Sequence, residues 1–274
     1  MISIIIPTYN GQKTIKSLLD QVIKIDDKIQ KEIIIIDSSS SDNTVKIAKN
    51  YTHKVFIIPK NKFNHGLTRN HAVSLTSRKS KYIFLTTQDT LLTSKAIFQD
   101  YLSSFKKHPD SVVAFGPHLP HPNTPLFEAS EVHCLFNKIQ KYYQNPTNQR
   151  CWEKYFISHN NAMYKKSFLL KHPFDKSSFG EDLKMGIFIE NHKYEKVFVK
   201  NASVFHSHSY SLINYIKREK TDLKHRGKLH IPLQSNLSCK LKYIWNSNAN
   251  YFEKSIQTFR GIIRYVCKLF IIFL

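Results

Sequence analysis

Residues 2–10 of the 274-residue chain read ISIIIPTYN, and this stretch decides the fold. Its β-branched apolar run ends in a polar turn, and Thr14–Ile25 then carries apolar side chains at helical spacing, which predicts a strand, a loop and a helix. The same order recurs where the isoleucines of Ile33–Ile36 end in a serine-rich loop before a helix predicted over Thr44–Asn50. Continuous apolar strands that are each followed by a helix indicate an α/β fold with a mostly parallel sheet covered on both faces.

Polar loops follow three of the predicted strands. They are Thr8–Asn10, Asp37–Asp42 and Thr86–Asp89, the last one coming after a strand predicted over Tyr82–Leu85. Because ligands of such sheets bind outside the carboxyl ends of the strands, we expect these loops to converge on one site. The pattern also predicts strands over 55–58, 112–115 and 195–199, helices over 69–77, 94–107 and 183–191, and helical segments from about Ser211 onward.

The composition excludes several classes of protein. With 41% apolar and 22% charged residues, the chain can build a packed core, which excludes disorder and a collagen-like fold. It has seven glycines, and neither G-x-G-x-x-G nor G-x-x-x-x-G-K-[ST] occurs in it, so it lacks the motifs of dinucleotide-binding folds and P-loop NTPases. The formal net charge of +21 favours an anionic partner, and residues 209–274 alone hold 12 basic and 3 acidic side chains.

The cysteines and the first apolar run indicate a cytoplasmic protein. Cys134, Cys151, Cys239 and Cys267 form no C-x-x-C pair, and we expect all four thiols to be reduced. The run Ile2–Ile6 is ended by Pro7 and is too short for a signal peptide or a membrane span.

Five segments in a fixed order resemble those of a known enzyme family. The segments IIIPTYN (4–10) and IDSSSSDNT (36–44) resemble the opening of family 2 glycosyltransferases, which have the GT-A fold. The segments FNHGLTRN (63–70), LTTQDT (85–90) and VFHSHSYS (204–211) are similar to the rhamnosyltransferase-like branch. The resemblance implies a Rossmann-like GT-A domain over 1–215, followed by a basic helical extension over 216–274. It also implies transfer of a sugar, with inversion, to a saccharide or lipid-linked saccharide in cell-surface polysaccharide synthesis. The donor that the resemblance favours is dTDP-L-rhamnose, which supplies L-rhamnose.

The resemblance implies a set of residues for the nucleotide-sugar donor. Asp37 can accept a hydrogen bond from N3–H of uracil or thymine, or it can be a plain turn carboxylate. Arg69 lies in a loop-to-helix stretch where a guanidinium can meet phosphate oxygens in a fork geometry, or it can be an ordinary surface arginine. The implied donor-binding residues are Pro7, Thr8, Tyr9, Asn10, Asp37, His65, Arg69 and Gln88.

Asp89 is the carboxylate that the resemblance implies as a metal ligand. A divalent cation there would stabilise the charge of the diphosphate leaving group. Most family members carry an Asp-x-Asp-Asp run where this chain has TTQD at 86–89, so a single carboxylate remains. His206 and His208 project to one face if the chain is extended, and they are either further ligands or a packing pair. Imidazole suits Mn²⁺ better than Mg²⁺, and we expect one of these two ions.

Asp182 is the catalytic base that the resemblance implies, with Glu181 as a supporting carboxylate. The segment FGEDL at 179–183 resembles the family's Gly-Glu-Asp motif, and the reaction needs a carboxylate that takes the proton of the acceptor hydroxyl. The alternative is that the two acids only complement a helix dipole. The segment SHNNA at 158–162 implies acceptor contacts by His159, Asn160 and Asn161.

The last residues predict an amphipathic helix over Ile256–Leu274. Its apolar positions are Ile256, Phe259, Ile263, Val266, Phe270 and Phe273, and Arg260, Arg264 and Lys268 form a basic row beside them. We expect the helix either to pack on the catalytic domain or to lie on an anionic membrane. The membrane alternative places the enzyme in the cytoplasm, peripherally on the cytoplasmic face of the inner membrane.

Other functions fit the sequence less well. The same fold with a UDP-hexose or UDP-N-acetylhexosamine donor is the nearest alternative, because the nucleotide is implied by the resemblance only. A basic nucleic-acid-binding protein would explain the net charge. However, the basic residues belong to no recognisable nucleic-acid-binding motif, and we expect no nucleic-acid partner. A glycoside hydrolase also needs carboxylates, but Asp37 and Asp89 are better explained by a nucleotide and a metal.

Overall fold

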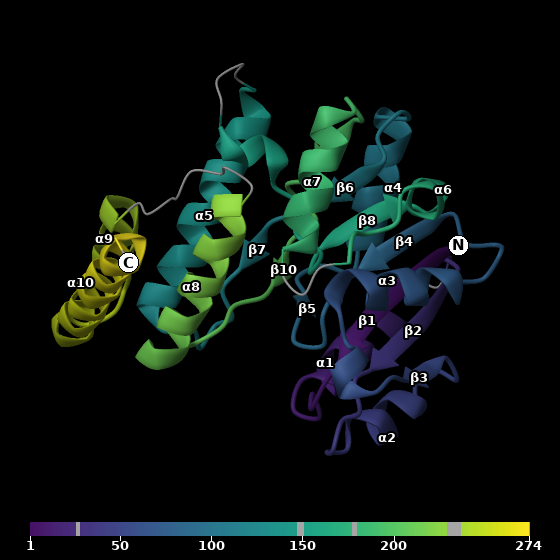
Figure 1. The fold of residues 1–274 in the computed structure, drawn as a ribbon, viewed down its shortest axis with the longest axis horizontal. Coiled ribbons are helices and arrows are strands. Elements are labelled where there is room, and N and C mark those ends of the chain that lie inside the picture. The colour runs from purple at the N-terminus through teal and green to yellow at the C-terminus, as the bar shows by residue number, and fades with distance from the viewer. Residues whose placement is uncertain (26–27, 147–150, 177–179, 229–236, 274) are drawn as a thin grey trace. The chain divides into compact units, whose positions relative to one another are not determined.

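The computed structural model describes residues 1–25, 28–146, 151–176, 180–228 and 237–273 (Figure 1). Side chains are described to residue 224 within 180–228 and to residue 268 within 237–273. The chain forms two compact units. The first comprises Met1–Pro117 and Lys154–His206, and the second comprises His118–Glu153 and Ser207–Leu274. The second unit therefore includes a middle segment of the chain as well as the residues expected to form an extension over 216–274.

A seven-stranded sheet with the order β3-β2-β1-β4-β8-β6-β9 forms the centre of the first unit. Its strands are β1 (Ile2–Thr8), β2 (Lys31–Asp37), β3 (Val55–Ile57), β4 (Tyr82–Leu85), β6 (Val113–Phe115), β8 (Ala162–Lys165) and β9 (Lys196–Phe198). β1 pairs in parallel with β2 and β4, in a register that sets Thr8 opposite Asp37. β8 runs antiparallel to β4 and β6, so the sheet is mostly parallel, as expected.

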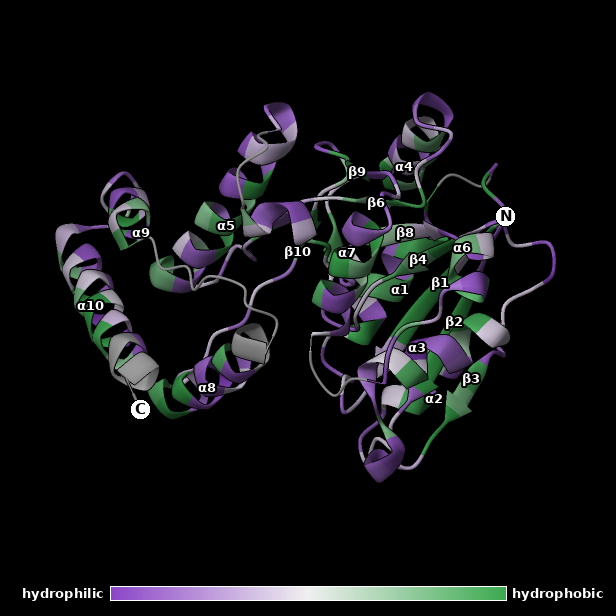
Figure 2. Cartoon of the chain, turned by 45° about the horizontal axis from the view of Figure 1, so that its top comes forward, coloured by the Kyte–Doolittle hydropathy of each residue, from purple (hydrophilic) through white to green (hydrophobic). Residues whose placement is uncertain are grey.

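Both faces of β1 are covered. Ile4 and Ile6 join a core cluster with side chains of α1 (Ile15–Ile23) and α4 (Ile97–Lys107). Ile5 is equally buried and points to the opposite face, because successive side chains of a strand alternate. Figure 2 shows apolar residues concentrated on β1 and the neighbouring strands of the sheet. The predicted sheet with two covered faces is confirmed.

Several short elements complete the first unit. They are α2 (Thr44–Lys49), α3 (His65–Ser74), α6 (Lys166–Lys171), α7 (Glu181–Asn191) and the antiparallel pair of β5 (Leu91–Leu92) and β10 (Val204–Phe205), with a 3₁₀ turn at Lys60–Lys62. The sequence pattern does not predict β5, β8 or α6, because β5 has only two residues, and β8 (AMYK) and α6 (KSFLLK) mix apolar and charged residues over four and six positions.

The second unit is helical. It contains β7 (His118–Leu119), α5 (Leu126–Gln144), α8 (Leu212–Lys228), α9 (Leu237–Trp245) and α10 (Tyr251–Phe273), and the 3₁₀ turn Trp152–Tyr155 lies at its boundary. A disulfide joins Cys134 of α5 to Cys239 of α9. The expectation that all four thiols are reduced is therefore wrong for this pair, because 105 positions of sequence hide the packing of α5 against α9. Among the described residues, no helix combines the length and the apolar composition needed to cross a bilayer.

The predicted C-terminal helix is present as α10, but its basic row points into the second unit. Arg264 is 1% exposed, and its Nη1 lies 2.8 Å from Oε1 of Glu128 on α5. Arg260 Nη2 lies 2.5 Å from the same oxygen, and Lys268 Nζ lies 2.6 Å from Oε2 of Glu219 on α8. Of the two alternatives for this helix, the basic row fits packing within the protein, because ion pairs within the second unit hold all three cations.

Candidate active site

A buried carboxylate lies at the carboxyl ends of β1 and β2. Asp37 is fully buried and accepts hydrogen bonds from the hydroxyl groups of Thr8 (2.7 Å) and Ser40 (2.6 Å) and from the Ser40 amide (2.8 Å). The backbone amide of Asn10 donates to Ser40 Oγ, and its side-chain oxygen accepts from the Ser41 amide. The first two predicted loops thus converge, as expected.

The third predicted loop is joined to the first through the side-chain amide of Gln88. Its Oε1 accepts from the Tyr9 amide and its Nε2 donates to the Tyr9 carbonyl, both at 2.9 Å. A carboxylate at this position could accept but not donate. Gly11 makes room for the contact, because a Cβ there would lie 2.2 Å from Gln88 Oε1. Tyr9 is 40% exposed and its hydroxyl accepts from Lys60 Nζ, while Pro7 lies half-buried within β1.

Asp89 and His206 bring a carboxylate and an imidazole together in the first unit. Asp89 follows β4 and His206 follows β10, and Asp89 Oδ1 lies 3.8 Å from His206 Nε2. Ligands of one cation at about 2.1 Å stand roughly 3 to 4 Å apart, so this pair fits a single Mn²⁺ or Mg²⁺. The Asn160 side-chain nitrogen lies 3.1 Å from the same imidazole nitrogen. His208 belongs to the second unit, and its part in the site stays a prediction.

A buried ion pair joins α3 to the first turn of α7. Arg69 Nη1 donates to Glu181 Oε1 at 2.7 Å, and the two side chains are 3% and 7% exposed. His159 Nδ1 lies 3.3 Å from the same oxygen, and its Nε2 lies 2.9 Å from the Tyr164 hydroxyl of β8. Burial lowers the pKa of His159 to about 4. A neutral ring with its proton on Nδ1 satisfies both contacts.

The two adjacent acids of α7 have opposite shifts in pKa. Burial raises the pKa of Glu181, but the Arg69 charge and the His159 hydrogen bond outweigh it and hold that pKa well below its usual range. For Asp182, burial and the neighbouring Glu181 charge raise the pKa to about 7. Gly180, with a left-handed φ of 72°, sets the start of the helix. Asp182 remains half-buried at the surface, so it can exchange a proton near neutral pH.

The structure changes the expected roles of three residues. Arg69, expected on the diphosphate, is buried against Glu181, and His65 lies half-buried 3.5 Å from its Nη1. Asn161, expected at the acceptor, is fully buried and bonds the Tyr101 hydroxyl and the Ala202 carbonyl, both at 2.7 Å. His159 is 1% exposed and contacts Glu181. Like Asn161, it is buried because the turn before β8 is packed into the core. Of the predicted acceptor residues, Asn160 is partly exposed.

Sequence reasoning missed two contributors to this site. Ser40 lies in a run of four serines, in which no spacing distinguishes the one that holds Asp37. Tyr164 lies on β8, whose sequence AMYK has no continuous apolar run that would predict a strand. Neither position carries a signal that could have identified it.

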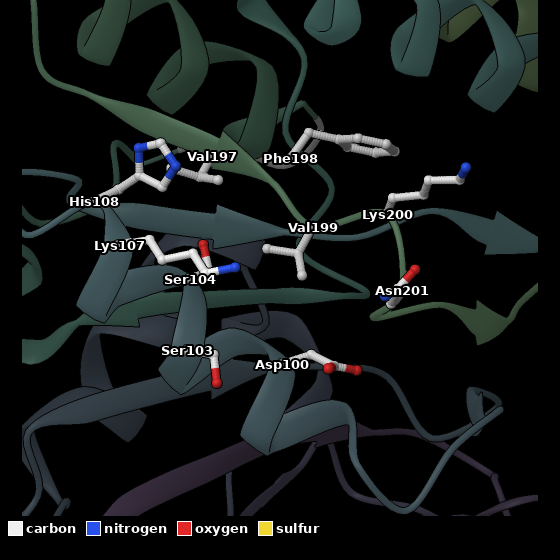
Figure 3. Close-up of a pocket in the computed structure, with 10 residues that line it drawn as sticks. All are labelled: Asp100, Ser103, Ser104, Lys107, His108, Val197, Phe198, Val199, Lys200 and Asn201. Carbon is white, nitrogen blue, oxygen red and sulfur yellow. The ribbon is translucent and has the colours of Figure 1, made fainter.

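A groove of about 380 Å³ lies elsewhere on the first unit, along α4 and β9 (Figure 3). Its lining residues are Asp100, Ser103, Ser104, Lys107, His108, Val197, Phe198, Val199, Lys200 and Asn201. None of the predicted site residues is among them, so this groove is not the site built around Asp37 and Asp182.

Comparison with known proteins identifies relatives of the chain. The sequence pattern named "Glycosyl transferase family 2" matches residues 3–172. The chain is 29% identical over 212 residues to the O-antigen chain rhamnosyltransferase WbaN of Salmonella anatum, covering 76% of this chain and 67% of WbaN. It is 30% identical over 215 residues to the O-antigen chain rhamnosyltransferase RfbN of Salmonella typhimurium, covering 77% of this chain and 67% of RfbN.

A solved structure shares the fold. The mannosyltransferase PcManGT from Pyrobaculum calidifontis, in complex with GDP-Man and Mn²⁺, matches 99% of this chain and 84% of its own chain. The TM-score is 0.64 and the sequence identity is 13%, so the likeness concerns the fold alone. The expected GT-A fold is confirmed.

Proposed function

The chain belongs to glycosyl transferase family 2 and is a nucleotide-sugar-dependent glycosyltransferase, and from this premise we propose that it transfers L-rhamnose from dTDP-L-rhamnose, with inversion, to a saccharide or lipid-linked saccharide acceptor. Two relatives named as O-antigen chain rhamnosyltransferases, which match about three quarters of the chain, favour this sugar. The enzyme would act in the synthesis of a cell-surface polysaccharide. Its catalytic domain would span residues 1–215.

Asp37 is the group that recognises the base. Its carboxylate is oriented by Thr8 and Ser40, and the three protein donors leave it capacity for one more hydrogen bond, from N3–H of the base. The exposed ring of Tyr9, next to Thr8, offers an aromatic face beside it. Because thymine and uracil both carry N3–H, a UDP-hexose or UDP-N-acetylhexosamine is the alternative donor.

Asp182 is the base. In its ionised form it takes the proton of the acceptor hydroxyl while that oxygen attacks the anomeric carbon, and the nucleoside diphosphate leaves from the opposite face, so the configuration inverts. The position of Asp182 in the first turn of α7, beside the buried Arg69–Glu181 pair and partly exposed, supports this assignment, and a pKa raised to about 7 suits a base that is partly ionised near neutral pH. Arg69 keeps Glu181 ionised, and the Glu181 charge in turn keeps Asp182 basic.

Asp89 and His206 would hold Mn²⁺ or Mg²⁺, with His208 as a further ligand, and the ion would stabilise the charge of the departing diphosphate. Asn160, which contacts His206 and is partly exposed, remains the proposed acceptor contact. We place the enzyme in the cytoplasm, at the cytoplasmic face of the inner membrane, where a lipid-linked acceptor would be presented.

A donor screen tests this function. The protein is incubated with dTDP-L-rhamnose, UDP-hexoses and UDP-N-acetylhexosamines, each with Mn²⁺, Mg²⁺ or EDTA, and release of the nucleoside diphosphate is measured. We expect the fastest release from dTDP-L-rhamnose, and the anomeric configuration of the product is then read by NMR. Faster release from a UDP-sugar would replace the proposed donor, and a retained configuration would reject direct displacement.

A further inference from the structure

The helix α10 is packed with its polar side inward. Gly261 lies so close to Phe127 of α5 that a Cβ would stand 2.8 Å from its ring. The Arg264 guanidinium lies over the rings of Phe127 and Tyr215, at 5.3 and 4.7 Å from their centres, besides its ion pair with Glu128. The face that a soluble helix normally turns to water is therefore the face that holds α10 in the second unit.

The opposite side of α10 is apolar and exposed. Phe252 is 76% exposed, Ile256 49%, Phe259 66% and Val266 42%, and their spacing places them on one side of the helix. We call these four residues the α10 stripe. A continuous row of bulky apolar side chains on a protein surface marks an interaction site. No described residue of the second unit covers these four side chains, so the stripe is a candidate interaction surface.

We propose that the α10 stripe inserts into an anionic lipid surface, with α10 lying in the plane of the interface. The inference rests on the membrane location proposed above, and it does not depend on the donor sugar. Amphipathic helices bind in this way through their apolar side. At the start of α10, Tyr251 contacts Trp245 of α9 edge to face, with 5.6 Å between the ring centres, and both rings are exposed, as is typical of side chains at a membrane interface.

The charge of the same region complements an anionic surface. Residues 209–274 hold 12 basic and 3 acidic side chains. The three cations of α10 are used within the unit, but Lys217, Lys220 and Lys224 of α8 and Lys242 of α9 are exposed. Such cations are attracted to acidic headgroups.

A second copy of this chain fits the stripe less well. In a coiled coil, the positions that flank the apolar seam carry charges that pair across the interface. Here they are Ser255 and Ile262 on one side and Glu253 and Arg260 on the other, and Arg260 is already held by Glu128. The seam therefore lacks free pairs of opposite charge, whereas Ile262, 43% exposed, widens the apolar side as a lipid contact requires.

Sedimentation of the full chain with vesicles tests the proposal. We expect binding to vesicles of phosphatidylglycerol and phosphatidylethanolamine, and much less to pure phosphatidylcholine. The double variant Phe252→Gln/Phe259→Gln should bind at least about tenfold more weakly, because two aromatic insertions are lost. A matched control is Ile57→Gln/Leu170→Gln, which removes side chains that are 58% and 60% exposed in the first unit and should bind as the wild type does.

Four further measurements separate the outcomes. Vesicles with brominated acyl chains should quench the tryptophan fluorescence of the wild type, and Trp245→Phe should abolish this quenching. The readout requires no change in the α10 stripe. Wild-type binding by the double variant, with an unchanged thermal melt, would overturn the proposal. So would a lipid-free dimer that the double variant dissociates, since the partner would then be a second copy. Transfer to a soluble acceptor is assayed in parallel, and its absence would reject the proposed function without altering the vesicle result.

Discussion

Arg69 and Glu181, 112 positions apart in the sequence, form a buried ion pair with 2.7 Å between Nη1 and Oε1. The pair fixes the first turn of α7 against α3 and keeps a negative charge directly beside Asp182. A buried pair of this kind contributes little net stability over an apolar pair of similar volume. Its effect here is electrostatic: the Glu181 charge, after burial, is what raises the proton affinity of Asp182.

Glu181→Gln should shift the pH dependence of turnover to lower pH. The substitution removes the negative charge beside Asp182 and leaves the positive Arg69, and both changes favour the ionised base. Turnover of the wild type should fall as the pH drops below about 7, where Asp182 becomes protonated. In the variant we expect this acidic limb to lie about one pH unit lower. The measurement is kcat against pH, and an unmoved limb would show that Glu181 does not tune the base.

Asp182→Asn should leave binding of the nucleoside diphosphate within a few-fold and lower turnover by ~10²-fold or more. Calorimetric titration and initial rates check the two parts. Turnover close to that of the wild type would exclude Asp182 as the base.

The same variant should be more stable than the wild type at pH 8. A folded-state pKa raised from 3.8 to about 7 means that the folded protein loses stability as the pH rises through this range, because ionised Asp182 is disfavoured by burial. The neutral amide avoids that loss. We expect a higher Tm for Asp182→Asn at pH 8 and a smaller difference at pH 5. A lower Tm at pH 8 would contradict the raised pKa.

Asp89→Ala should weaken the metal-dependent part of nucleoside-diphosphate binding, because it removes the carboxylate of the proposed metal pair. Titrations with Mn²⁺ and with EDTA measure this part as a difference. In Asp89→Ala, the affinities for the nucleoside diphosphate measured with Mn²⁺ and with EDTA should become similar. The control is Asp175→Ala, because the Asp175 side chain is 73% exposed, and this variant should retain the wild-type difference between the two affinities. Full wild-type activity in EDTA would remove the metal from the mechanism.

Local sequence patterns were sufficient for part of the fold. The isoleucine runs of β1 and β2 predict strands and a sheet covered on both faces, because each run is short, β-branched and, apart from Ser3, apolar. They also place Thr8 and Asp37 at one edge. Long-range pairing is invisible to such patterns: Glu181 reads as a supporting acid and Arg69 as a phosphate contact, and only the folded structure shows that the two side chains form an ion pair.

The helix α10 illustrates the other limit of sequence reasoning. Its period of apolar and basic residues is visible in the sequence and predicts a helix correctly. Which side faces inward depends on the partner, and here the partner is Glu128, a carboxylate buried on α5. An interior acid reverses the usual orientation, because Arg264 must satisfy it.

Glu128→Gln should destabilise the second unit more than any change on the α10 stripe. It leaves Arg264, 1% exposed, without its carboxylate, and breaking a buried pair in this way costs about 3–5 kcal/mol. Urea unfolding followed by circular dichroism measures the loss, and Glu253→Gln, an exposed acid on α10, is the matched control and should change stability little. The same reasoning predicts that deleting 256–274 destabilises the unit by stranding Glu128, so point variants of exposed residues separate membrane binding from folding better than truncation does. Equal stability of Glu128→Gln and Glu253→Gln would refute the inward role of the basic row.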